Sequence, residues 1–127
     1  MQRGLILFAH GARDPRWALP FEAVARGVRE RDPQLMVQLA FLEFMTPGLL
    51  DAGHALAQAG CTRADVVPLF LGAGGHVRKD LPLLLDELAA RHPQIRWQLR
   101  GAIGEVESVI NAMAQAALAM TLDEAPA

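Results

Sequence analysis

The sequence predicts one α/β domain in three layers, with a four-stranded parallel sheet between helices. Short apolar runs alternate with segments whose apolar residues recur at helical spacing, a pattern typical of βαβ units. The chain has 127 residues, 52% hydrophobic and 20% charged, which is enough for one core and too little for two domains. We expect this domain to span residues 1–120. Residues 121–127, small and acidic without periodicity, are expected to form a frayed tail.

Four segments are predicted as strands, and the first three are apolar enough to be covered on both faces of the sheet. They are residues 4–10, 35–43, 64–71 and 94–100. By analogy with other open parallel sheets we expect the strand order 2-1-3-4. That order makes the first three strands neighbours.

Three stripes of apolar residues at spacings i, i+3, i+4 and i+7 predict helices that face the sheet. The stripes are Phe21, Val24, Ala25 and Val28; Leu81, Leu84, Leu85 and Leu88; and Val106, Val109, Ile110 and Met113. A further helix is expected to begin at Thr46 and Pro47, a capping residue followed by proline, and to end at Gly60. We expect Asp80 to cap the helix that begins at Leu81.

Charge and composition exclude several classes of partner. A formal net charge of -2 gives no overall attraction to nucleic acid or to an anionic membrane. The single cysteine, Cys61, has no partner for an internal disulfide, and no apolar run reaches the ~20 residues of a membrane-spanning helix. The first residues lack the features of a secretory signal. We therefore expect a cytoplasmic protein that binds neither nucleic acid nor membrane.

Three polar residues follow neighbouring strands of the predicted sheet. His10 comes after the first strand, Glu43 ends the second, and His76 lies in the glycine-rich loop after the third. Parallel strands end at one edge of a sheet, so these side chains are expected to line one cleft. Two imidazoles and a carboxylate suit a divalent transition metal, and the carboxylate can also accept protons.

Each of these residues also has a plainer interpretation. A histidine after a strand is often a loop residue bonded to backbone. Glu43 lies between Leu42 and Phe44 at a strand end that we expect to be buried, where a carboxylate must be paired, ligating or protonated. A structural ion pair therefore remains an alternative for Glu43.

The loop around Gly72, Gly74 and Gly75 has two interpretations as well. Glycines before a helix let backbone amides bind phosphate, but no nucleotide-binding motif is present. A mobile loop that carries His76 is the alternative that we favour.

Basic residues flank both histidines. Arg13 and Arg16 follow His10, and Arg78 and Lys79 follow His76. Arginine pairs with carboxylates through two parallel hydrogen bonds, so the cluster would suit a ligand with several carboxylates. The alternative is solvated charge near the start of each helix.

Three segments together resemble the sirohydrochlorin chelatase family, in its short single-lobe CbiX-like form. They are LILFAHGARDP, LAFLEFMTPGL and VVPLFLGAGGHVRKDLP, in the order found in that family. The resemblance covers residues 3–118. One departure is Ala12, where the family often has serine, so a hydroxyl contact there is in doubt.

The resemblance implies a flavodoxin-like chelatase lobe that forms a homodimer. It implies insertion of Co²⁺ or Fe²⁺, with Ni²⁺ as a further option, into the carboxylate-rich tetrapyrrole sirohydrochlorin. The product would serve cobalamin or siroheme biosynthesis, and no organic cofactor is expected. By the same resemblance His10 and His76 bind the metal and Glu43 helps to remove pyrrole protons. The residues expected to contact the substrate are Arg13, Arg16, Gly74, Gly75, Arg78 and Lys79.

A non-catalytic alternative uses the same histidines in a metal carrier or a tetrapyrrole-binding module. Binding without faster metal insertion would identify it. A histidine phosphatase is a weaker rival, because Ala9 stands where that chemistry needs arginine before the histidine.

Overall fold

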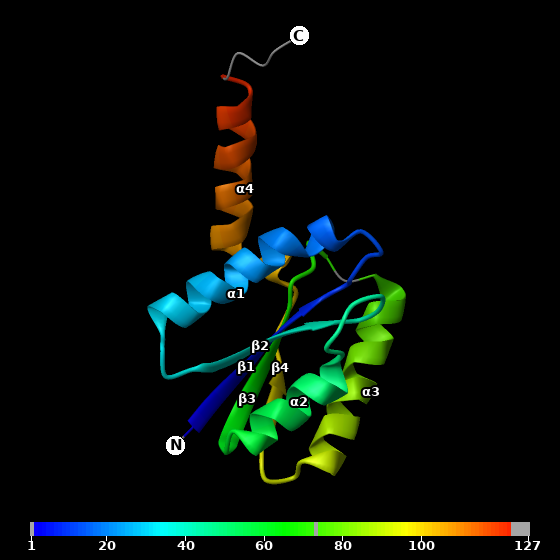
Figure 1. The fold of residues 1–127 in the computed structure, drawn as a ribbon. Coiled ribbons are helices and arrows are strands. Elements are labelled where there is room, and N and C mark those ends of the chain that lie inside the picture. Colours follow the sequence, from blue (N-terminus) through cyan, green and yellow to red (C-terminus); the bar gives the residue numbers. More distant parts are fainter. Residues whose placement is uncertain (1, 73, 123–127) are drawn as a thin grey trace.

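The computed structural model describes residues 2–72 and 74–122, apart from the side chain of His76, and it has the predicted α/β architecture (Figure 1). The four strands are parallel and lie in the predicted order β2-β1-β3-β4. The elements in chain order are β1 (Gln2–Ala9), η1 (Pro15–Ala18), α1 (Leu19–Arg31), β2 (Met36–Phe41), α2 (Leu49–Gln58), β3 (Cys61–Pro68), α3 (Gly75–Arg91), β4 (Arg96–Leu99), η2 (Ile103–Glu105) and α4 (Glu107–Met120). Residues 123–127 of the predicted tail lie outside the described residues.

The larger part of the core lies between the sheet and helices α2 and α3. Alternate strand residues such as Ile6 and Val66 point to this side and are fully buried. Leu56 of α2 and Leu88 of α3 pack against them with no exposed surface. Each such side chain contributes about 1.5–3 kcal/mol by leaving water. The predicted leucine stripe of α3 is therefore confirmed.

Helix α1 covers the opposite face over β1 and β2. Ala25 of α1 is buried against Leu7 and Val37, and Val28 packs at the edge of this cluster. Val24 was expected in the same stripe but is 44% exposed, so the stripe of α1 only partly faces the sheet. Trp17 packs on Phe21 at a ring-centroid distance of 4.5 Å, so it is a packing residue.

Helix α4 does not pack on the sheet, and the prediction for its stripe was wrong. None of the residues of α4 is buried, and Ile110 and Met113 are 48% and 40% exposed. Figure 1 shows the helix projecting from the end of the domain. The sequence pattern indicates an apolar helical face but does not identify the surface that covers it.

Two helices begin at residues other than those predicted. The bond between Thr46 and Pro47 is a cis peptide in the loop, and α2 begins at Leu49, after an extended Gly48. Helix α2 ends at Gln58, two residues before the predicted Gly60, which has the positive φ of 81° common just after a helix C-terminus. None of the described helices is both long and apolar enough to cross a bilayer.

Helix α3 begins at Gly75, so Asp80 lies inside the helix and does not cap it. Gly74 takes the extended conformation of an N-cap residue, with φ −71° and ψ 168°. Glycine is accepted at that position without a capping side chain. The helix therefore starts six residues before Leu81, and His76 lies in its first turn instead of in a loop.

Candidate functional site

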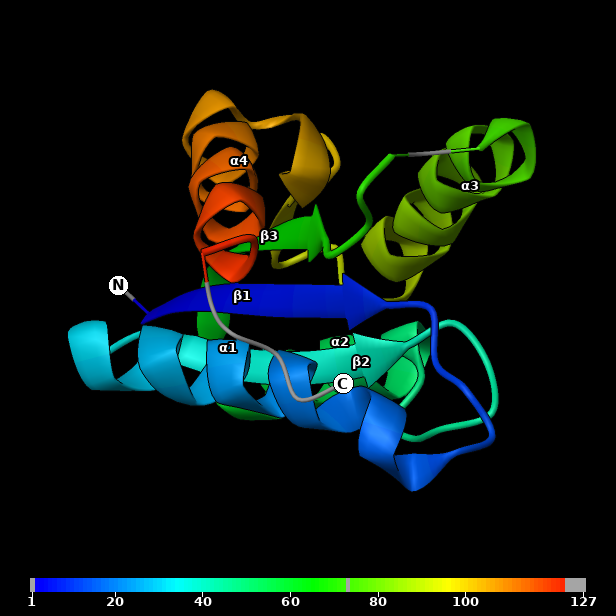
Figure 2. The same ribbon diagram turned by 90° about the horizontal axis from the view of Figure 1, so that it is seen from above.

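The loops after β1 and β2 are joined by backbone hydrogen bonds beyond the ends of the strands. The amides of Leu42 and Glu43 donate to the carbonyls of Ala9 and His10, at N···O distances of 2.9 and 3.0 Å. Figure 2 shows these loops and the loop after β3 leaving the sheet at the same edge. The structure thus places His10 and Glu43 next to each other at the carboxyl edge of the sheet.

The imidazole of His10 is supported from one side. Its ring stacks on Phe70, with the centroids 4.1 Å apart and the planes inclined by 26°. Phe70 is 2% exposed and packs in the main core, so its position is fixed by the fold. His10 itself is exposed. Within the described part of the chain its nitrogens have no hydrogen-bond partner, which leaves them open to a proton or a metal ion.

Gly11 allows the two loops to approach so closely. Its φ is 89°, a left-handed conformation that favours glycine, and a Cβ at this position would overlap the carbonyl oxygen of Glu43. The glycine after His10 therefore sets the spacing between His10 and Glu43.

Glu43 is not the buried residue that the sequence predicted. The second strand ends at Phe41, two residues earlier than expected, and Glu43 is exposed in the following loop. Its carboxylate has no ion-pair partner among the described residues, so the alternative of a structural ion pair finds no support there. An exposed carboxylate at this edge can accept a proton and release it to water.

Exposed apolar side chains occur in the loops after β2 and β3, at the same edge of the sheet. Leu42 and Phe44 in the loop after β2 are 41% and 56% exposed, and Leu71 after β3 is 73% exposed. Phe44 has a positive φ of 67°, a left-handed backbone conformation that is uncommon for a bulky residue. Such a group of exposed apolar side chains suits a flat apolar ligand.

Arg13, in the loop after β1, contacts the ring of Phe44, in the loop after β2. Its guanidinium carbon lies 4.6 Å from the centroid of Phe44, a cation–π contact. Both side chains are exposed, so the charge of Arg13 remains available to an anionic group beside the apolar one.

Arg16, in contrast, is held by a local partner. Its guanidinium donates to the carboxylate of Asp14, with an Nη2···Oδ2 distance of 2.9 Å. The backbone amide of Arg16 also donates to Asp14, which is the N-terminal cap of η1. This arginine lowers the pKa of the Asp14 carboxyl, and the carboxylate raises the pKa of Arg16. Asp14 is thus held both as a cap and as an ion-pair partner.

The start of α3 carries the remaining predicted residues. Gly74 and Gly75 form its N-terminus, where the amide of Arg78 donates to the carbonyl of Gly74 at 3.0 Å. The side chain of His76 lies outside the described residues, so its pairing with His10 stays a prediction. Lys79 is exposed.

Arg78 lies beside a pocket near the end of β3. Its guanidinium is 3.6 Å from the carboxylate of Glu105 in η2. The pocket wall is formed by Pro68, Arg78, Leu81, Pro82, Leu99, Arg100, Gly101, Ala102 and Glu105.

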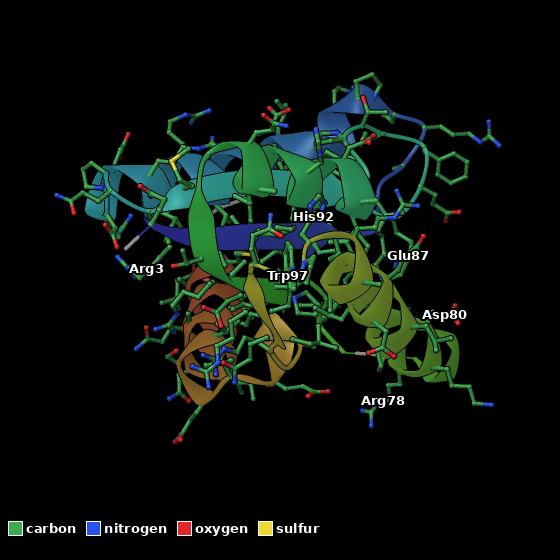
Figure 3. All side chains as sticks on the ribbon, turned by 90° about the horizontal axis from the view of Figure 1, so that it is seen from below. Arg3, Arg78, Asp80, Glu87, His92 and Trp97 are labelled. Atoms are coloured by element: carbon green, nitrogen blue, oxygen red, sulfur yellow. The ribbon has the colours of Figure 1, made fainter. Side chains whose placement is uncertain are left out.

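In Figure 3 Arg78 lies toward the N-terminal end of α3 and His92 toward its other end. The ring of His92 is 5.8 Å from that of His54, so these two histidines group with each other.

A complete metal site is not seen in the described side chains, where no three histidine, cysteine, aspartate or glutamate residues come together. His10 and Glu43 are two residues of metal-ligating type whose loops are bonded to each other at the carboxyl edge. Sequence reasoning did not identify Gly11, Phe70 or Phe44 as parts of this site. Gly11 could have been identified because it directly follows His10. Phe70 was predicted only as part of a strand.

Comparisons with known proteins identify the family of the chain. A family model described as CbiX matches residues 4–119. The sirohydrochlorin ferrochelatase of Bacillus subtilis is 26% identical over 89% of this chain and 43% of its own length. The sirohydrochlorin cobaltochelatase of Methanocaldococcus jannaschii is 33% identical over 69% of this chain and 62% of its own length. The chain thus spans less than two thirds of both relatives.

A solved structure has the same fold over nearly all of its length. It is the crystal structure of a protein from Marinobacter aquaeolei VT8 whose name is cobalamin (vitamin B12) biosynthesis CbiX protein. The two chains superpose with a TM-score of 0.82 and 31% identity, covering 94% of this chain and 97% of the other. With the family model matching residues 4–119, these similarities show that the chain belongs to the CbiX family.

Proposed function

We propose that this protein is a chelatase that inserts Co²⁺ or Fe²⁺ into sirohydrochlorin. The observation that carries the proposal is the fixed and open imidazole of His10, stacked on the buried Phe70 and joined through the backbone to the exposed Glu43. The names of the relatives, a sirohydrochlorin cobaltochelatase and a ferrochelatase, indicate the substrate and the two metals. Metallation serves cobalamin or siroheme biosynthesis in the cytoplasm, and Ni²⁺ is a further substrate metal.

The chemistry requires an exchange of two pyrrole protons for one dication. A neutral imidazole binds a borderline metal ion and gives it up when the macrocycle nitrogens replace it. We assign this delivery to His10 and His76. Glu43 accepts pyrrole protons, since its backbone is bonded to that of His10 and its side chain is exposed to water. The imidazole must be neutral to hold the metal, because a protonated ring nitrogen has no lone pair to donate.

The surroundings of His10 match a flat macrocycle with carboxylate arms. Leu42, Phe44 and Leu71 offer apolar surface to a ring face. Arg13, which lies over the ring of Phe44, and Lys79 of α3 are both exposed and can pair with carboxylates. Arg78 is a third contact, in competition with Glu105, and the N-terminal amides of Gly74 and Gly75 are further donors. Arg16 contributes least, because Asp14 already binds its guanidinium.

The protein acts as a homodimer in this proposal. Two copies facing each other would enclose a macrocycle that one exposed edge cannot cover.

The test is anaerobic insertion of Co²⁺ and Fe²⁺ into sirohydrochlorin, followed by absorbance and compared with a reaction without protein. We expect faster insertion with the protein, and a loss of that acceleration in His76→Ala with no change in thermal stability. Reversal of charge in Arg78→Glu should mainly raise KM. Tight binding of metal or tetrapyrrole without faster insertion would identify a carrier instead and refute the proposal.

A further inference from the structure

Two of the four histidines of the chain lie away from the proposed insertion site. His92 stands between the end of α3 and the start of β4, at the amino edge of the sheet, whereas His10 follows a strand at the carboxyl edge. The ring of His54, on α2, is 5.8 Å from that of His92, with the ring planes inclined by 43°. This His54–His92 pair has no role in the proposed function.

The separation of the two rings suits a metal ion held between them. Neutral imidazole is a common ligand of divalent transition metals. A bond between such an ion and a histidine nitrogen is about 2.0–2.1 Å long, so an ion bonded to one nitrogen of each ring holds the ring centroids about 5–6 Å apart. The observed separation of the His54–His92 pair lies within that range.

The backbone of His92 is fixed by three hydrogen bonds. Its amide donates to the carbonyl of Leu88 at 2.9 Å. Its carbonyl accepts from the amide of Ile95 at 3.1 Å and from the indole Nε1 of Trp97 at 3.3 Å. Leu88 and Ile95 are buried in the main core. A ligand that is anchored in this way loses little freedom when it binds an ion.

Gly53 lets α2 come close to the elements that flank His92. This glycine is buried, and it directly precedes His54. A Cβ at this position would overlap the side chain of Leu88 in α3, and it would lie 3.2 Å from Cη2 of Trp97 in β4. The close approach of α2 to α3 and β4 therefore sets the spacing of the His54–His92 pair.

The charges near the pair favour a cation. His92 is the C-cap of α3, and the backbone carbonyls at that end of a helix carry partial negative charge. Asp51 is exposed and lies one helical turn from His54. Arg91, the neighbour of His92 in the sequence, is paired with Glu87 at 2.9 Å, so its charge is already compensated.

Gln58 can orient the ring of His54 for such an ion. It lies one turn further along α2, and its side-chain amide nitrogen is 3.3 Å from Nε2 of His54. Half a turn of this amide brings its oxygen to the same nitrogen, where it accepts the Nε2 proton and leaves a lone pair on Nδ1. Outer hydrogen bonds of this kind fix the rings of most metal-binding histidines.

We propose that His54 and His92 together bind one divalent transition-metal ion, such as Zn²⁺, in a second metal site at the amino edge of the domain. Water completes the coordination, since no third histidine, cysteine, aspartate or glutamate joins the pair in the described part of the chain. The ion ties α2 to the segment between α3 and β4 and so favours the folded chain. This site goes beyond the proposed function, because insertion uses neither histidine.

The first test isolates the pair by removing the other two histidines. A chain with His10→Ala and His76→Ala keeps only His54 and His92 as imidazole ligands. We expect calorimetric titration at neutral pH to show one bound equivalent of Zn²⁺. Loss of an outer hydrogen bond already weakens a metal site about 10–100-fold, so His54→Ala and His92→Ala, each added to that chain, should weaken zinc binding at least about 10-fold.

Two results of this titration would overturn the proposal. One is the absence of a zinc equivalent with a Kd below about 1 mM in the two-histidine chain. The other is a single substitution of His54 or His92 that leaves the affinity unchanged, because a bridging ion needs both rings. Circular dichroism confirms that the variants fold.

The second test asks whether both rings bind the same ion. The two-histidine chain, labelled with nitrogen-15 in its histidines, gives separate ring resonances for His54 and His92. We expect both sets to shift together with added Zn²⁺ and to stop shifting at one equivalent. Movement of one ring alone would mark an adventitious ion and overturn the proposal. Neither test depends on the insertion reaction, because both histidines proposed to deliver the metal are absent from the chain.

Discussion

Replacement of Gly11 by alanine tests the geometry that holds His10 beside Glu43. Two costs add in this variant. Alanine in a left-handed conformation costs about 1–2 kcal/mol. The new Cβ also overlaps the carbonyl oxygen of Glu43, and relief of such overpacking costs about 1–3 kcal/mol more. We therefore expect Gly11→Ala to lose about 2–5 kcal/mol of unfolding free energy.

Gly60→Ala is the matched control for the conformational cost. Gly60 has a φ of 81°, close to the 89° of Gly11, but a Cβ there would meet nothing within 4 Å. The control should lose only the first cost, about 1–2 kcal/mol. Urea denaturation measures both variants, and the difference between them isolates the contact between the loops.

The two variants should differ even more in activity. The overlap forces the loops apart, and a displacement of about 1 Å in a positioned group can cost 100-fold in rate. We expect kcat/KM for metal insertion to fall about 100-fold in Gly11→Ala and to stay near wild type in Gly60→Ala. Equal losses of stability and equal rates in the two variants would refute the close approach of Gly11 and Glu43.

Three further predictions concern single contacts. Phe70→Leu keeps an apolar core residue but removes the ring that stacks on His10. Insertion should slow about 10-fold, while the free energy of unfolding falls by less than about 1.5 kcal/mol. An unchanged insertion rate would count against the stacking role. The guanidinium of Arg3 lowers the pKa of Asp32, so this pair stabilises the fold above the ordinary aspartate pKa and the effect is lost as pH falls through the lowered value. Arg3→Ala and wild type should therefore converge in acid denaturation profiles, and a gap that widens toward low pH would contradict this. Burial raises the pKa of the Cys61 thiol, so the free energy of unfolding should fall as pH rises above the pKa of the thiol in the unfolded chain. Rapid labelling of the native protein by a thiol reagent would contradict the burial of Cys61.

The sheet could be predicted from the sequence because its signals are local. Apolar runs of strand length alternate with helical stripes, and that pattern requires parallel strands with crossing helices. The strand order 2-1-3-4 came from analogy and is confirmed. The edge that carries His10 and Glu43 follows from the order, since parallel strands end on the same side.

Other features depend on contacts that a local pattern does not contain. Gly74 acts as N-cap through its backbone alone, so the start of α3 was placed at Asp80, a better capping side chain. Glu43 was assigned to a buried strand end because its neighbours are apolar, although Leu42 and Phe44 are themselves exposed. The stripe of α4 led to a prediction that the helix faces the sheet, although none of its residues is buried. The overlap between Gly11 and Glu43 is visible only in three dimensions.

The most direct test of the central claim is the rate of anaerobic Co²⁺ insertion into sirohydrochlorin by His10→Ala, with His54→Ala as its control. His54 is an exposed histidine of α2 that groups with His92, so its loss leaves the proposed site intact. The account predicts that His10→Ala loses at least about 100-fold of the protein-dependent rate while His54→Ala keeps it. An insertion rate in His10→Ala equal to that of wild type would contradict the account.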